Sequence, residues 1–368
     1  MNLDQVEKIA NAVLYEGYIL YPYRPSAVKN QQRWNFGALC PGSYSEAQAG
    51  TEACSMQTEC LIAGDERATL DVKLRFLHLV SREVGVPVAD ENDDGLQAGI
   101  SDSHFRVVEA LEVGDQVFYT WQEAVERDVS LSGLNVRELA VQPRRLPFSF
   151  PSKREIEPLH DQDGQVVGVI VRRQQAIEGE IELRITDCRL RNEEQTGASH
   201  PQSETRIPQL VKVTVRVLNL TPLGDAKLKS RDEALMHSLV STHTILSVRD
   251  GEFVSLLEPP PTLAELAASC NNMGTWPVLV GEAGARDCML SSPIILYDYP
   301  QIAPESAGDL FDGTEIDEIL TLRIMTLTDS EKREMRGVDE HARRILERTE
   351  TLAPEQMMRL HGAMKVKE

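Results

Sequence analysis

Side chains able to act as nucleophiles, bases or metal ligands gather in two parts of the sequence. The first is the glycine-rich segment 274–292, where glycines permit close approach of a backbone or ligand. Five of its side chains are candidates for lining a small-molecule pocket: Trp276, Arg286, Asp287, Cys288 and Ser291. A serine and an aspartate of this segment, together with His237 or His243, have the residue types of a catalytic triad. Isolated histidines are also common structural residues, and both interpretations stay open.

The second group is the cysteine set Cys40, Cys54 and Cys60. Thiolates bind zinc or iron when tight turns hold them close together. The spacings of 14 and 6 residues, without a nearby histidine, match no standard zinc or iron–sulfur pattern. Small buried cysteines are the ordinary alternative to a metal site. We therefore predict no metal ion, and we keep a metal-carrying protein as an alternative hypothesis.

The common cofactor and hydrolase motifs do not occur in this sequence. It contains no P-loop, GxGxxG, GxSxG, HExxH or CxxC pattern, and we predict no cofactor. An acidic run at 309–318 has oxygen ligands suited to a hard cation. A solvated acidic connection, or an acidic docking patch, explains the same run.

Aromatic residues are concentrated between positions 15 and 44 and share this stretch with three basic residues, and no acidic residue lies between Glu16 and Glu46. This stretch reverses the local sign of charge in a chain with a net charge of −20. Amphipathic rings beside cations suit a protein-binding surface. The predicted partner-binding residues are Tyr18, Tyr21, Tyr23, Arg24, Lys29, Arg33 and Trp34. The alternative is that the cations pack over the tyrosines and pair with acids of the same protein.

The composition excludes several classes of function. The chain has 368 residues and a net charge of −20, which disfavours binding to nucleic acid or to anionic lipid. No apolar run is long enough for a membrane span, and the N-terminal residues lack the pattern of a signal peptide. With only six cysteines, we expect reduced thiols and a cytoplasmic protein without membrane insertion.

The elements that must position these groups are mostly strands. A helix is predicted over 6–14, followed by strands at 57–62, 69–80, 106–111 and 116–119 and a short helix at 122–128. Further strands are predicted at 166–171, 181–185, 210–220, 244–248 and 253–257. Beyond these we expect a helix at 262–269, strands at 276–280, 292–297 and 319–325, and helices after 329.

This pattern predicts an α+β, strand-dominated fold with a central antiparallel, β-sandwich-like sheet, an N-terminal helix and C-terminal helices. Three prolines at 142–151 indicate a domain boundary. The predicted regions are an N-terminal α+β region (1–150), an antiparallel β-rich domain (151–328) and a C-terminal helical segment (329–368).

Four blocks of sequence, at 18–36, 55–61, 274–298 and 304–328, resemble an uncharacterised family of accessory proteins. That family is associated with gene clusters for high-affinity, oxygen-tolerant [NiFe] hydrogenases of the actinobacterial type. The resemblance implies an accessory role and supplies no catalytic residues. The chain also lacks the paired CxxC motifs of the subunit that carries nickel and iron.

The leading hypothesis is therefore a non-catalytic accessory or assembly protein. Its partner would be a hydrogenase large or small subunit, or a maturation factor. The alternatives are a small-molecule enzyme of unknown reaction, with a pocket around 274–292, and a metal-carrying protein that uses the N-terminal cysteines.

Overall fold

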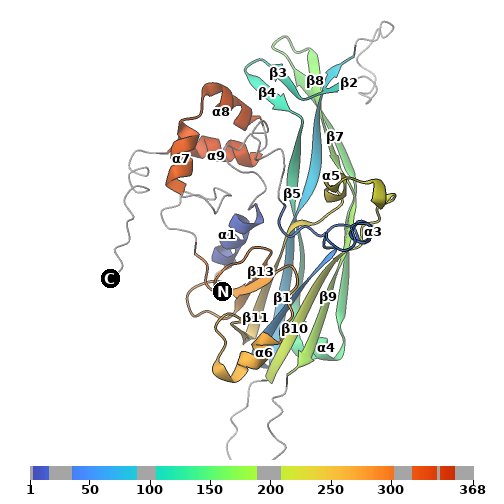
Figure 1. The fold of residues 1–368 in the computed structure, drawn as a ribbon. Helices are drawn as coiled ribbons and strands as arrows, with labels where there is room; N and C mark the ends of the chain where they lie inside the picture. The colour runs from blue at the N-terminus through green and yellow to red at the C-terminus, as the bar shows by residue number, and fades with distance from the viewer. Residues whose placement is uncertain are drawn as a thin grey trace, which may run out of the picture.

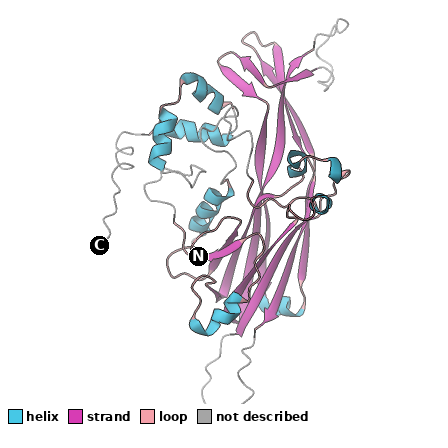
Figure 2. Cartoon of the chain, viewed as in Figure 1, coloured by secondary structure: helices cyan, strands magenta, loops and turns pink. Residues whose placement is uncertain are grey.

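The computed structural model describes residues 3–15, 35–88, 105–188, 209–301, 317–337 and 340–352 and is dominated by antiparallel strands (Figures 1 and 2). The strands are β1 (Ser55–Pro87), β2 (Phe105–Val108), β3 (Ala110–Val113), β4 (Gln116–Tyr119), β5 (Trp121–Asn135), β6 (Arg144–Phe150), β7 (Lys153–His160), β8 (Val166–Gln174), β9 (Ile177–Asp187), β10 (Gln209–Asn219), β11 (Val240–Val254), β12 (Trp276–Leu279) and β13 (Cys288–Ser292). The α-helices are α1 (Leu3–Leu14), α3 (Gly42–Ala47), α4 (Val136–Val141), α5 (Arg231–Leu235), α6 (Ala264–Ala268), α7 (Asp317–Met325), α8 (Asp329–Arg336) and α9 (Glu340–Glu350). None of these helices has the length and apolar character needed to cross a membrane.

Strand β1 is the long central strand of the sheet, and the strands that pair with it change along its length (Figure 1). At Leu61 it pairs with β10 and with β11, which therefore lie on opposite sides of it. Further along, β5 takes the place of β10 and β8 takes the place of β11. Because each partner covers only part of β1, one long strand joins a wide lower sheet to a narrow upper tip.

The lower sheet curls around the main hydrophobic core. Alternate residues of β1, such as Val72, Leu74 and Phe76, point into this core and meet alternate valines of β10. Helix α4 adds Val136 and Leu139. Each fully buried side chain of this size contributes about 1.5–3 kcal/mol relative to exposure, so this packing dominates the stability of the fold.

The upper tip of the sheet has a smaller core of its own. Val84, Leu159 and Ile170 are buried there, and Leu111 and Phe118 of the β3–β4 hairpin pack against them. The tight turn between β7 and β8 contains Gly164, whose φ of 79° favours glycine. The two hairpins β3–β4 and β7–β8 therefore stand side by side at the tip.

Helices α7, α8 and α9 pack on one side of the sheet, the same side as α1 (Figure 1). Ile324, Met335 and Leu346 of these helices are buried against Leu77 and Leu79 of β1. The helices thus form a wall that faces the strands near the tip.

The predicted fold class is confirmed: the chain has a strand-dominated α+β fold with a large antiparallel sheet. The N-terminal helix, the C-terminal helices and the hairpin before β8 also form as the sequence predicts. Apart from the separate β3–β4 hairpin, the strands of 1–150 and 151–328 belong to one eleven-stranded sheet, because β1 pairs with β8, β10 and β11. The proline-containing segment predicted as a boundary is itself strand β6, paired with β9.

Several local predictions are wrong. Residues 122–128 are strand rather than helix, because pairing of β5 with β1 overrides their helix propensity. Residues 319–325 are helix α7 rather than strand. The predicted strand at 292–297 ends at Ser292 instead, and Tyr299 returns to donate a backbone hydrogen bond to Leu279 at 2.7 Å.

Candidate functional site: an arginine-lined pocket

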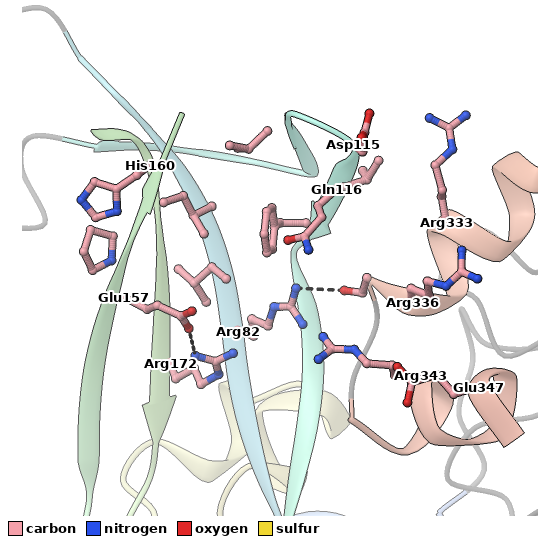
Figure 3. A pocket seen from close by; sticks show the side chains of 17 residues that line it. Arg82, Asp115, Gln116, Glu157, His160, Arg172, Arg333, Arg336, Arg343 and Glu347 are labelled. Atoms are coloured by element: carbon pink, nitrogen blue, oxygen red, sulfur yellow. Dashed lines mark hydrogen bonds and ion pairs between the residues drawn. The ribbon is translucent and has the colours of Figure 1, made fainter. Parts of the chain in front are cut away.

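A pocket of about 780 Å³ lies between the upper tip of the sheet and helices α8 and α9 (Figure 3). Its strand side comes from β1, β3, β4, β7 and β8, and its helical side comes from α8, α9 and Gly337, which directly follows α8. Five arginines line it: Arg82, Arg172, Arg333, Arg336 and Arg343. The charged residues of opposite sign in the lining are Asp115, Glu157 and Glu347.

Two of the arginines form the floor of the pocket through a chain of ion pairs. Arg172 donates to Glu157 at 2.7 Å and, from Nε, to Glu123 at 2.8 Å. Arg82 donates from Nη1 to the other oxygen of Glu123 at 3.1 Å, and from Nη2 to the carbonyl oxygen of Gly337 at 2.9 Å. These charge-assisted contacts join strands β1, β5, β7 and β8 to the end of α8. Arg82, at their centre, is only 5% exposed.

The other three arginines lie on the helical wall and are exposed. Helix α8 begins with a capping box formed by Thr328 and Glu331, and Arg333 and Arg336 follow at helical spacing. Arg336 pairs with Glu350 at 2.6 Å, and Arg343 of α9 has a longer contact with Glu340 at 3.6 Å.

Gly337 brings this wall close to the sheet. A Cβ atom at position 337 would collide with the backbone carbonyl of Val117 on β4. Only glycine permits this approach without movement of the backbone. The position of the helical wall therefore depends on Gly337 and on its hydrogen bond from Arg82.

The remaining lining is apolar or weakly polar. The half-buried Val113, Val117 and Phe118 supply the apolar surface, while Gln116 and His160 lie higher in the pocket (Figure 3). Among the residues that the structure describes, the lining contains no serine, threonine, cysteine, lysine or tyrosine. Arginine stays protonated and presents several donors, so this arrangement is suited to binding an anionic group that carries an apolar part.

The predicted partner-binding residues all lie outside the described residues. They are Tyr18, Tyr21, Tyr23, Arg24, Lys29, Arg33 and Trp34. Two aromatics at the ends of the same stretch are described. Tyr15 is buried against the C-terminal helices, and Tyr44 is buried beside Cys40. Phe36 is 44% exposed.

The five residues predicted to line a pocket at 274–292 lie on or beside the paired strands β12 and β13 and differ in exposure and direction. Trp276 is 44% exposed at the start of β12, and Arg286 is exposed. Cys288 and Ser291 are buried and three positions apart on β13, so their side chains point to opposite faces of the sheet. Asp287 is half-buried, and its carbonyl oxygen accepts a hydrogen bond from the backbone of Val248.

Ser291 belongs to a buried cluster of hydroxyl groups. Its oxygen lies 2.6 Å from the hydroxyl of Thr58 and 2.7 Å from that of Thr275. His243 is also buried, and its Nδ1 donates to the carbonyl oxygen of Ser241 at 2.5 Å. Burial lowers the pKa of His243 to about 4. Burial raises the pKa of the Cys288 thiol to about 12, which disfavours the thiolate.

The cysteines considered as metal ligands occupy different places. Cys60 lies in the main core, where burial raises the pKa of its thiol, while Cys40 lies in a small cluster with Tyr44. Cys54 is half-buried. Among the described residues, no group of three or more histidine, cysteine, aspartate or glutamate side chains could hold a metal ion.

Sequence reasoning missed the arginine-lined pocket. Arg333, Arg336 and Arg343 fall in the C-terminal segment 329–368, for which the sequence predicts only helices. A usable signal was the presence of Arg82 and Arg172 inside strands that are otherwise largely apolar, since such arginines usually have a specific partner. Comparisons of the chain with protein-family models, with curated proteins and with solved structures gave no match.

Proposed function

We propose that this chain is a non-catalytic accessory or assembly protein that binds a protein partner. The observation that carries the proposal is the contrast between two sets of side chains. The groups best suited to nucleophilic chemistry, Cys288 and Ser291, are buried within the sheet. The large pocket at the surface is lined instead by arginines and apolar groups, which suit binding.

The sequence resemblance supplies the class of partner. It points to a large or small subunit of a [NiFe] hydrogenase, or to a factor that matures it. An accessory protein of this kind needs a stable scaffold and exposed contact surfaces. The curled sheet supports a scaffold role, since its interior is filled by packed apolar side chains.

The test is affinity capture of the tagged full-length chain from a host that expresses such a hydrogenase, followed by mass spectrometry. A hydrogenase subunit or maturation factor should be recovered with the wild-type chain. Replacing Tyr21, Tyr23, Arg24 and Trp34 together by alanine should reduce its recovery if the aromatic–basic stretch makes the contact. Deletion of the gene with unchanged hydrogenase activity would count against the proposal.

A further inference from the structure

The arginine-lined pocket differs in sign of charge from the chain as a whole. The protein carries a net charge of −20, yet the lining of the pocket brings together five arginines and three carboxylates. Such a local reversal of sign attracts anionic ligands, which the net negative charge of the whole chain otherwise disfavours. The pocket is thus a distinct cationic site on an acidic protein.

The five arginines divide into an inner pair and an outer set of three. Arg82 and Arg172, the inner pair, are engaged by Glu123 and Glu157 and hold the floor together. On the outer wall, Arg343 makes only a 3.6 Å contact with an exposed glutamate. No carboxylate of the described residues lies within ion-pair distance of Arg333. The outer arginines therefore retain donors for a ligand.

We propose that this pocket is the docking site for an acidic polypeptide segment of a partner protein. Carboxylates of the segment pair with Arg333, Arg336 and Arg343, and an apolar side chain packs against the half-buried Val113 and Phe118. This inference rests on the proposed function, because it names the surface and the chemistry through which a partner is held.

The exposure of the outer arginines favours a polypeptide over a small anion. Small-molecule sites usually enclose their ligand and place a few polar groups with precision. Here the side chains of Arg336 and Arg343 are 43% and 49% exposed. Exposed arginines spread over two helices match the several spaced carboxylates of an acidic segment, and they increase its rate of association.

The carboxylates of the lining argue against a nucleic acid in this pocket. Asp115, Glu157 and Glu347 stand among the arginines. A polynucleotide carries a phosphate at every residue and would meet these carboxylates with like charge. A polypeptide can place neutral or basic side chains opposite these carboxylates. The mixed lining therefore favours a polypeptide with a matching order of side chains over a polymer of uniform negative charge.

The experiment measures binding of a fluorescein-labelled peptide of glutamates interrupted by two leucines to the full chain by fluorescence anisotropy. The test variant carries Arg333→Glu and Arg343→Glu. The matched control carries Arg249→Glu and Arg286→Glu, which are 55% and 50% exposed and lie outside the pocket lining. Circular dichroism checks that each variant is folded, and Arg333→Gln with Arg343→Gln replaces the test variant if it is not.

We expect the test variant to bind the peptide at least about tenfold more weakly than wild type, and the control to bind within about threefold of wild type. Raising the salt concentration to about 0.5 M should also weaken binding. Absence of binding to wild type, or equal loss in both variants, would overturn the inference. Tighter binding of a single-stranded oligonucleotide of equal charge would overturn the choice of a polypeptide.

The same variants separate this inference from the proposed function. If hydrogenase proteins are captured equally by wild type and by the Arg333→Glu, Arg343→Glu variant, the accessory role stands and the pocket is not its docking site. If wild type binds the acidic peptide but captures no hydrogenase protein, the pocket assignment stands and the proposed partner class is wrong.

Discussion

Arg82, near the C-terminal end of the long strand β1, donates a hydrogen bond to the carbonyl oxygen of Gly337 at 2.9 Å, across 255 positions of sequence. The donor belongs to the sheet, and the acceptor lies at the end of α8. Glu123 holds the same guanidinium from β5 at 3.1 Å. This contact fixes the distance between the two walls of the arginine-lined pocket.

Replacing Gly337 by alanine should disturb the docking of α8 and α9. The added Cβ would collide with the carbonyl of Val117, so the helical wall must move. We expect a loss of about 1–3 kcal/mol in the free energy of unfolding, measured by urea denaturation, and faster proteolysis within α8 and α9. Gly224→Ala is the control, because a Cβ there meets open space. Equal behaviour of the two variants would show that Gly337 does not set the position of the wall.

Replacing Arg82 by methionine should destabilise the protein. The substitution leaves Glu123, whose side chain is 18% exposed, with Arg172 as its remaining partner in the network. We expect a loss of roughly 2–4 kcal/mol in the free energy of unfolding. Arg145→Met, at a side chain that is 70% exposed, should change stability by less than about 0.5 kcal/mol. A loss at Arg82 no larger than at Arg145 would contradict the role given to the floor network.

Replacing Ser291 by alanine tests whether this residue is structural. Its hydroxyl bridges those of Thr58 and Thr275, so alanine leaves buried polar groups without this partner. We expect a loss of about 1–3 kcal/mol in the free energy of unfolding and unchanged partner capture. Ser132→Ala, at an exposed position of β5, should be nearly neutral. A Ser291→Ala variant of normal stability that has lost a biochemical activity would favour the enzyme alternative instead.

Stability should fall on mild acidification. Burial, with the nearby Arg127, lowers the pKa of His78 to about 4, and burial lowers that of His243 to about 4 despite its bond to Ser241. The ordinary value is 6.5, so between pH 4 and pH 6.5 the unfolded chain binds protons that the folded chain does not. The free energy of unfolding should therefore decrease as pH falls through this window, by up to about 1.4 kcal/mol per pH unit for each histidine.

Urea denaturation at several pH values between 4 and 7 measures this dependence. The His78→Gln, His243→Gln variant should be less stable near pH 7 and should show a shallower slope. A slope identical to that of wild type would assign the acid sensitivity to other groups.

The sequence predicts the sheet well where one face of a strand is buried. Val72, Leu74 and Phe76 alternate with polar residues, and the structure places all three in the core. It fails where long-range pairing decides the conformation. Residues 122–128 favour a helix by themselves, but thirteen positions of β5 pair with β1 and hold them extended.

The candidate site was harder to predict because its parts are distant in sequence. Arg82 comes from β1, Arg172 from β8, and Arg333 and Arg343 from two successive helices. No local pattern joins these residues, since only the pairing of β1 with β8 and the packing of α8 near β4 bring them together. The helical character of the segment after 329 was recognisable, whereas the surface that those helices face was not.

Capture of hydrogenase proteins by the tagged full-length chain, compared between wild type and the Arg333→Glu, Arg343→Glu variant, tests the account most directly. We expect a hydrogenase subunit or maturation factor to be recovered with wild type, and its recovery to fall at least about tenfold with the variant. The Arg249→Glu, Arg286→Glu control should recover it normally. A wild-type eluate that contains no hydrogenase protein, from a host shown to express the enzyme, would contradict the account.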